Sequence, residues 1–308
     1  MSTETPISQQ GLVRAPHGLR TAQLLIAVSA ILYGTQGIFA SIAYDHGISL
    51  GMLLGVRSAC FALFALFLLN RRRRQTLRGH RRTVLIACIT SITGPLLYFA
   101  AVARMDPTTV TLIFFIYPAL TVIGARILGR VHLTALSIVV TIVTLVGVGL
   151  AIGGPSGNID LLGIVLALGF AVVISAYFLA AERGLEGVDP MAWLGVTVLA
   201  AALFFVPIAP FFGGLAVPDA QAGLALLGLV IVASMLPCLF QTAGLMRLGS
   251  AATSLVATLE IATVVVLSYV VLGERPGIVS LIGATLVIIG AVAAPIAIRR
   301  RTVLPSAL

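Results

Sequence analysis

The sequence predicts an all-α integral membrane protein with ten transmembrane helices in two inverted five-helix repeats. Hydrophobic residues occupy 59% of the 308 positions and charged residues only 9%, whereas charged residues make up about 25% of an ordinary soluble domain. The hydrophobic residues fall into ten runs of about 20 residues, which is the length that a helix needs to cross the core of a bilayer. Five of these runs repeat the other five at an offset of 140 to 143 residues.

The internal repeat is recognised from short identical segments at equivalent places in the two halves. Leu54-Gly55-Val56 is repeated as Leu194-Gly195-Val196, and Gly147 is repeated as Gly290. Five runs per copy is an odd number, so the second copy must enter a membrane from the side opposite to the first. Inverted repeats of this kind occur in transporters that alternate access to a central site.

The expected spans follow the apolar runs in order. In the first half they are residues 21–43, 48–70, 83–104, 107–128 and 133–152, and in the second half 160–181, 190–212, 220–245, 250–272 and 277–298. They define a tail at 1–20, a first repeat at 21–152, a second repeat at 160–298 and a tail at 299–308. Residues 153–159 are rich in glycine, proline and serine, which predicts a turn-rich linker. The first run is too long for a signal peptide, so no cleavage is expected.

All 19 basic residues are arginines, and their positions predict the orientation of the spans. If both termini lie in the cytoplasm, sixteen arginines fall on the cytoplasmic side, only Arg104 and Arg275 fall outside, and Arg57 lies within a span. Short cytoplasmic loops carry an excess of arginine, so we expect a multi-pass protein of the cell (inner) membrane with both termini cytoplasmic. The run Arg71–Arg74 would suit nucleic acid in isolation, but its place between two spans makes it a topology determinant. No nucleic-acid partner is therefore expected.

Residues that could support catalysis or metal binding are sparse. The three cysteines, Cys60, Cys88 and Cys238, lie within apolar runs at spacings that match no metal motif. The four histidines lie in tails, loops or span ends, and the chain contains no nucleotide-binding glycine loop. We therefore expect no enzyme activity, cofactor or metal, and any active transport would draw on a gradient of substrate or ion.

Several motifs occupy matching places in the two halves. They are Tyr33-Gly34-Thr35-Gln36, Arg57, Pro118 followed by Leu128-Gly129-Arg130, and Glu260-Ile261 followed by Leu272-Gly273-Glu274-Arg275. Together with the duplicated five-span arrangement, these motifs resemble the EamA family of the drug/metabolite transporter superfamily over about residues 20–298. The resemblance implies ten helices in two inverted repeats and transport of small metabolites, often export. Tyr33, Arg130 and Ile261 depart from the tryptophan, glutamate and proline that are usual in that family.

Two ionisable residues lie well inside expected spans, Arg57 in the second and Glu260 in the ninth. A charge at the bilayer centre costs about 3 kcal/mol on insertion scales, so such residues usually face the bundle interior and have a partner. Counted from the span ends, both lie at a similar depth near the midplane. Arg57 could bind a carboxylate, and Glu260 could bind an amino group or carry a coupling proton. The alternative is a structural ion pair that locks the repeats together.

Further candidates for the substrate site are the polar side chains expected near the same depth: Tyr33, Gln36, Tyr98, Tyr117 and Gln241. Such a lining would suit an amphipathic solute, and the alternative for each side chain is packing or an interhelical hydrogen bond.

The prolines Pro118 and Pro237 lie near mid-span and are candidate gating hinges; the alternative is a static kink. Trp193 is expected in the aromatic belt at the cytoplasmic interface. Gly147 and Gly290 are expected to serve internal packing, and a homodimer contact through the fifth and tenth spans is left open.

These features predict a secondary active transporter that exports a small metabolite, such as an amino acid or a related amphipathic compound, by alternating access. Its expected partners are membrane lipid, a small-molecule substrate and protons as the coupling ion. The alternatives are a membrane-embedded enzyme that acts on a lipid, or a channel or structural subunit.

Overall fold

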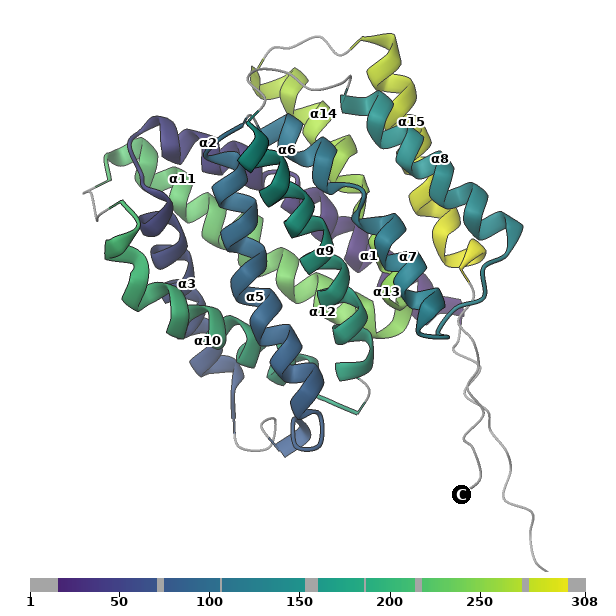
Figure 1. The fold of residues 1–308 in the computed structure, drawn as a ribbon, viewed down its shortest axis with the longest axis horizontal. Coiled ribbons are helices and arrows are strands. Elements are labelled where there is room, and N and C mark those ends of the chain that lie inside the picture. The colour runs from purple at the N-terminus through teal and green to yellow at the C-terminus, as the bar shows by residue number, and fades with distance from the viewer. Residues whose placement is uncertain are drawn as a thin grey trace, which may run out of the picture.

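The computed structural model describes residues 16–70, 75–105, 107–152, 160–185, 187–213, 218–272 and 277–298. Within these ranges the chain is almost entirely α-helical (Figure 1). The predicted linker and C-terminal tail, most of the predicted N-terminal tail, the Arg71–Arg74 run and the segment from Gly273 to Arg275 lie outside the described residues.

The helices follow the predicted apolar runs, and several runs are divided into two helices. The first half contains α1 (Pro16–Tyr33), α2 (Gln36–Asp45), α3 (Leu50–Leu68), α5 (Arg81–Val102), α6 (Pro107–Phe114), α7 (Tyr117–Ile127) and α8 (Ala135–Ile152). The second half contains α9 (Leu161–Gly184), α10 (Pro190–Ile208), α11 (Ala220–Val230), α12 (Leu236–Leu248), α13 (Ser250–Ala257), α14 (Leu259–Leu272) and α15 (Ile278–Ala297). A π-helical turn, Ile231–Met235, connects α11 to α12.

Eight helical stretches among the described residues are long and apolar enough to cross a membrane. They coincide with eight of the ten predicted spans. The predicted fifth and ninth spans hold shorter apolar stretches, Ala135–Ala151 and Ser250–Val264. The structure is therefore that of an all-helical, multi-pass membrane protein, and the count of ten spans stays a prediction.

Polar N-caps start several of the helices. Ser49 accepts a hydrogen bond from the backbone N–H of Met52 at the start of α3. Asp160, Asp189 and Asp219 accept backbone N–H groups in the same way at the starts of α9, α10 and α11. The first N–H groups of a helix have no partner within it, so these caps satisfy donors that would otherwise be lost at the membrane boundary.

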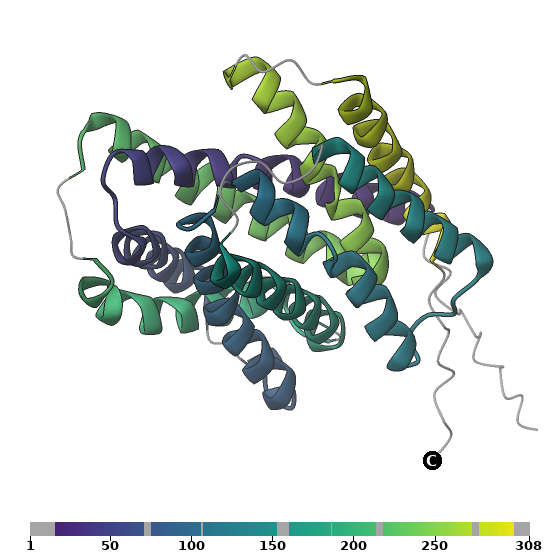
Figure 2. The ribbon, with the colours of Figure 1, turned by 45° about the horizontal axis from the view of Figure 1, so that its top comes forward.

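The most extensive helix contacts join the two halves of the chain. Helix α1 packs on α12, α3 on α10, α5 on α9 and α8 on α15. Figures 1 and 2 show α8 beside α15 along one edge of the bundle and α3 beside α10 near the opposite edge. This pattern of contacts is the same for the two halves. The first span of the first half (α1) packs on the third span of the second half (α12), and the first span of the second half (α9) packs on the third span of the first half (α5).

The first spans of the two halves run in opposite senses. The Tyr44 hydroxyl near the end of α2 donates to the Phe99 carbonyl near the end of α5 at 3.2 Å. Just beyond α5, Arg104 forms an ion pair with Asp160, the N-cap of α9, at 3.3 Å. The first span of the first half therefore ends where the first span of the second half begins.

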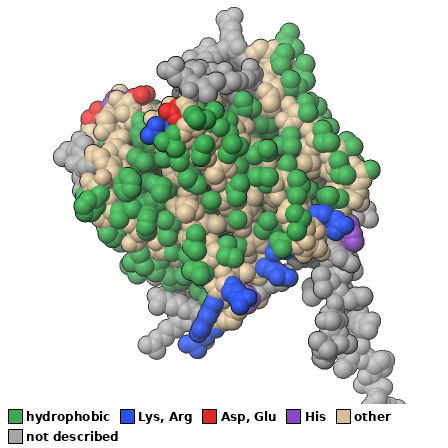
Figure 3. Space-filling view, in the orientation of Figure 1, with side chains coloured by type: hydrophobic (Ala, Val, Ile, Leu, Met, Phe, Trp, Pro, Cys, Tyr) green, Lys and Arg blue, Asp and Glu red, His purple; other side chains and the backbone are tan. Residues whose placement is uncertain are grey.

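The outer surface is apolar between two charged ends. Figure 3 shows hydrophobic side chains over most of the visible face, with arginines along the lower edge and acidic side chains at the opposite upper edge. Large side chains such as Leu63, Leu66 and Phe67 point outward. Apolar surface of this extent needs a lipid environment, because soluble proteins rarely expose large contiguous apolar patches.

Two packing details bear on the sequence predictions. Trp193 is completely buried, so its expected place in an interfacial belt is wrong. The indole lies against Gly184, where an added Cβ would come within 2.1 Å of the ring, so the missing side chain makes room for it. Gly147 and Gly290 both face the contact between α8 and α15, which is the expected internal packing role.

Candidate functional site

A cavity of about 170 Å³ lies between the two halves of the bundle. Its lining includes all seven side chains that the sequence predicted for a substrate site: Tyr33, Gln36, Arg57, Tyr98, Tyr117, Gln241 and Glu260. They come from the first, second, third, fourth, eighth and ninth predicted spans. The structure thus brings the predicted residues together, while their role in binding stays a prediction.

The interruptions in the first, fourth and ninth spans lie beside residues that line this cavity. The first span is broken between α1 and α2 at Gly34, the fourth between α6 and α7 at Ile116, and the ninth between α13 and α14 at Thr258. The eighth carries the π turn Ile231–Met235. Irregular backbone at membrane depth is tolerated where it is buried in protein or lines a cavity. Discontinuous helices also form the binding sites of many transporters.

The break in the first span packs closely on the ninth span. A Cβ on Gly34 would lie 2.8 Å from Thr263 Cβ and 2.9 Å from the Glu260 carbonyl oxygen. Only glycine fits at this distance, so the break in the first span rests directly on the beginning of α14. Tyr33 and Gln36 flank the break and are thereby brought to the cavity that Glu260 also lines.

Arg57 is held by polar and aromatic contacts rather than by a carboxylate. Its side chain is 6% exposed, and its Nε–H donates to the Ser234 hydroxyl at 2.9 Å. The guanidinium carbon lies 4.6 Å from the ring centre of Phe61 and 5.9 Å from that of Phe99. Such cation–π contacts stabilise a desolvated guanidinium.

Arg57 and Glu260 are not joined by an ion pair. The ion pairs between described residues include Arg104–Asp160 and Arg130–Glu182, and neither Arg57 nor Glu260 takes part in one. The alternative of a structural lock between Arg57 and Glu260 is therefore not the arrangement in this conformation. Both charged residues instead line the same cavity.

An aromatic wall lies on one side of the cavity. The rings of Tyr98, Phe114 and Phe170 form a cluster with centroid distances from 5.0 to 5.8 Å. The Tyr117 ring stacks on Phe178 at 5.9 Å, and its hydroxyl donates to the Ser254 carbonyl at 3.3 Å. Offset and edge-to-face rings of this kind present a rigid apolar surface.

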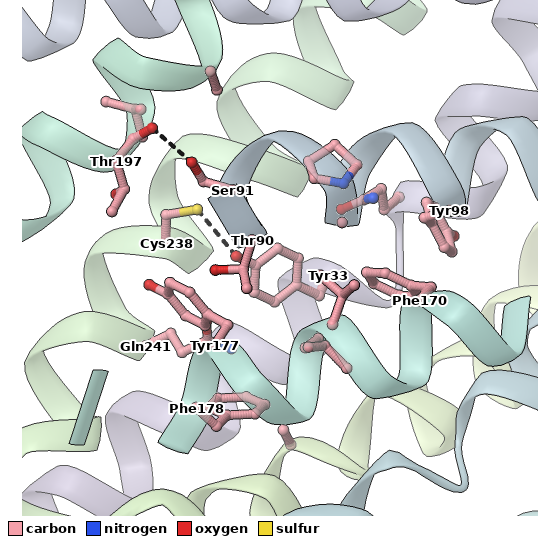
Figure 4. A pocket seen from close by; sticks show the side chains of 18 of the residues that line it. Tyr33, Thr90, Ser91, Tyr98, Phe170, Tyr177, Phe178, Thr197, Cys238 and Gln241 are labelled. Carbon is pink, nitrogen blue, oxygen red and sulfur yellow. Dashed lines mark hydrogen bonds between the residues drawn. The ribbon is translucent and has the colours of Figure 1, made fainter. Parts of the chain in front are cut away.

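Figure 4 shows further polar groups around the cavity that the sequence predictions did not include. Tyr33 and Cys238 are hydrogen-bonded at 3.0 Å, and the Ser91 hydroxyl donates to the Thr197 carbonyl at 2.9 Å (Figure 4). Tyr177 also lines the cavity. As a polar aromatic residue inside the sixth span, it carries the same signal that selected the other tyrosines.

The two candidate hinges lie at the irregularities. Pro118 occupies the first turn of α7 just after the break in the fourth span, and Pro237 occupies the first turn of α12 just after the π turn. Proline has no N–H to donate, so it suits the first turn of a helix. Pro118 thus begins a helical segment, whereas Pro237 lies within the continuous helical stretch Ala220–Leu248, and gating at these sites remains a prediction.

Comparison with known proteins matches the two halves separately. The model of the EamA-like transporter family matches residues 20–153 and again 161–294. A solved structure described as "Crystal structure of protein" superposes with a TM-score of 0.75 at 18% identity, covering 89% of this chain and 96% of that chain. At this identity the likeness shows the fold alone. No curated protein gives a match. The two matched segments cover most of the chain and coincide with the two predicted repeats, so the protein belongs to the EamA-like transporter family of the drug/metabolite transporter superfamily.

Proposed function

We propose that the protein is a secondary active transporter that exports a small amphipathic metabolite, such as an amino acid, by alternating access. One observation carries the proposal: a single cavity, built from both halves, contains a guanidinium and a carboxylate that do not pair with each other. Family membership supports transport as the activity.

The chemistry of the lining suits a zwitterion with an apolar body. Arg57 offers a planar fork of N–H donors that matches a carboxylate, and Glu260 offers an acceptor for an ammonium group or a site for a coupling proton. The rings of Tyr98, Phe114 and Phe170 offer an apolar surface. A bound zwitterion would give each buried charge a partner, which offsets the cost of keeping both charges inside the membrane.

Alternating access would arise from movement of one repeat against the other around the cavity. Arg57 belongs to the first repeat and Glu260 to the second, so a substrate that bridges them contacts both. The breaks in the first, fourth and ninth spans, together with Pro118 and Pro237, supply places where helices can change direction. Rocking of repeats around a midplane site is a known route for alternating access in inverted-repeat transporters.

The charge distribution supports an inner-membrane location with ten spans and cytoplasmic termini. Arginines gather along the lower end of the face shown in Figure 3. By the positive-inside rule, the arginine-rich end faces the cytoplasm. The starts of α1 and α10 and the ends of α3 and α9 would then lie on the cytoplasmic side.

Export is tested by untargeted comparison of culture medium. Cells would produce the wild-type protein, Arg57→Gln, Arg57→Lys, the control Arg104→Gln, or no transporter. We expect a compound with a carboxylate and an apolar body to accumulate with wild type and Arg104→Gln, weakly with Arg57→Lys, and not with Arg57→Gln. Identical media from wild-type and transporter-free cells would overturn the export proposal. Equal accumulation with Arg57→Gln would overturn the role of Arg57 alone.

Proton coupling is tested separately in proteoliposomes with a pH gradient. Radiolabelled L-phenylalanine is a suitable probe, because it carries both charges and an aromatic body. We expect the gradient to stimulate uptake by wild type and not by Glu260→Gln. Unchanged dependence on the gradient in Glu260→Gln would rule out Glu260 as the proton carrier.

A further inference from the structure

The π turn Ile231–Met235 precedes the part of the eighth span that lines the cavity with Cys238 and Gln241. Ser234 lies in this turn and is completely buried. Pro237 follows in the first turn of α12 and has no N–H, so the Ala233 carbonyl lacks the usual donor four residues later. Single π-helical turns inside α-helices are often found at functional sites.

The Ser234 hydroxyl accepts a hydrogen bond from one particular N–H group of the Arg57 guanidinium. It accepts the Nε–H at 2.9 Å, and the guanidinium is flanked by the rings of Phe61 and Phe99. A guanidinium has five N–H groups, and the other four belong to its two terminal nitrogens. Arg57 lines the cavity, so with Nε already engaged a carboxylate in the cavity would bind end-on through the two terminal nitrogens.

The backbone that carries Ser234 is itself anchored to the first span. The Ser29 hydroxyl of α1 donates to the Pro237 carbonyl at 2.8 Å. One residue further along, Cys238 is hydrogen-bonded to Tyr33 at 3.0 Å. These contacts fix the start of α12 relative to α1, so Ser234 offers Arg57 an acceptor at a defined place.

We propose that Ser234 is a positioning residue that fixes the Arg57 guanidinium, so that its two terminal nitrogens receive the substrate carboxylate end-on. The assignment rests on the proposed function, because it requires a carboxylate-bearing substrate in this cavity. Its consequence is specific: loss of the hydroxyl should weaken recognition of a carboxylate and leave recognition of an ammonium group unchanged.

The test is uptake of radiolabelled L-phenylalanine into proteoliposomes by wild type, Ser234→Ala and Ser234→Thr. Ser58→Ala is the matched control, because Ser58 is also completely buried, neighbours Arg57, and its hydroxyl has no partner among the described residues. We expect Ser234→Ala to raise KM about fivefold with little change in maximal rate, as removal of one orienting hydrogen bond predicts. Ser234→Thr retains a hydroxyl and should stay close to wild type.

Two competitors separate positioning from general damage. Inhibition by 3-phenylpropionate, which has the carboxylate alone, should weaken about fivefold in Ser234→Ala, while inhibition by phenethylamine, which has the ammonium alone, should not change. Equal weakening for both competitors, a loss of maximal rate at constant KM, or kinetics identical to Ser58→Ala would each overturn the assignment. No saturable uptake by wild type would instead overturn the proposed substrate class, and the assignment with it.

Discussion

The close contact between α8 and α15 predicts that one added methyl group at Gly283 destabilises the protein. A Cβ on Gly283 would lie 2.1 Å from the Ala151 nitrogen and 2.6 Å from the Gly147 oxygen. These are backbone atoms that cannot rotate away, so Gly283→Ala must push the helices apart, and overpacking typically costs about 1–3 kcal/mol. Gly149 lies on α8 with nothing within 4 Å of an added Cβ. Gly149→Ala is therefore the matched control, with a gain of up to about 1 kcal/mol from helix propensity.

Thermal unfolding in detergent measures the difference in stability between Gly283→Ala and Gly149→Ala, and the intrinsic tryptophan fluorescence of the protein can follow it. Trp193 is the sole tryptophan and is completely buried, so its fluorescence reports loss of packing. The two variants should differ by about 1–4 kcal/mol, which corresponds to an apparent Tm lower by several degrees in Gly283→Ala. Equal Tm values would refute the close packing of these helices. The glycine faces of the fifth and tenth predicted spans would then remain available for the homodimer contact that the sequence left open.

Three further changes test other parts of the protein. Glu182→Gln removes the carboxylate that faces Arg130 at 3.4 Å in a mostly buried site, so the unfolding free energy should fall by about 3 kcal/mol in the same fluorescence scan. The Gly163 backbone N–H holds the pKa of Asp160 below its usual range, so Asp160 stabilises the start of α9 at neutral pH and loses that effect below about pH 4. Wild type should therefore lose Tm more steeply than Asp160→Asn as the pH falls from about 6 to about 3. Gly34→Ala places a Cβ 2.8 Å from the nearest side-chain atom of the ninth span, so L-phenylalanine uptake should fall at least about tenfold.

Each of these predictions has a clear contrary outcome. A Tm unchanged in Glu182→Gln would mean that the buried pair adds nothing to stability. Parallel pH profiles for wild type and Asp160→Asn would show that the Asp160 charge does not stabilise α9. For Gly34→Ala the control is Gly223→Ala in α11, where an added Cβ meets nothing within 4 Å. Equal uptake by these two glycine variants would contradict the tight contact at the first-span break.

The sequence was sufficient to predict seven of the residues that line the cavity, for an energetic reason. A charge or an amide inside an apolar span is costly, so Arg57, Glu260 and Gln241 had to meet other polar groups inside the bundle. Tyrosines buried at the same depth follow the same rule. The internal repeat then indicated which spans occupy equivalent places in the two halves. No knowledge of side-chain contacts was needed for these predictions.

The partners of these residues could not be predicted in the same way. Ser234 carries no signal, because a serine in a helix can bond to its own backbone at little cost. The burial of Trp193 depends on the missing side chain of Gly184 in the preceding helix, which no periodicity encodes. The pairing of Arg130 with Glu182 likewise depends on how α7 and α9 end side by side. Such contacts depend on the tertiary arrangement and not on local sequence.

The two repeats place equivalent positions around one cavity and fill them differently. Arg57 corresponds to Thr197 and Glu260 to Tyr117, and all four line the cavity. The Thr197 hydroxyl bonds to carbonyls of its own helix and the Tyr117 hydroxyl to a carbonyl of α13, so both are satisfied by the scaffold. Arg57 has donors in excess of its one bond to Ser234, and the Glu260 carboxylate forms no ion pair with a described residue. Divergence of the copies has thus left one charge on each repeat. A zwitterion bound to both would make its affinity depend on how the repeats are placed relative to each other, which is the coupling that alternating access requires.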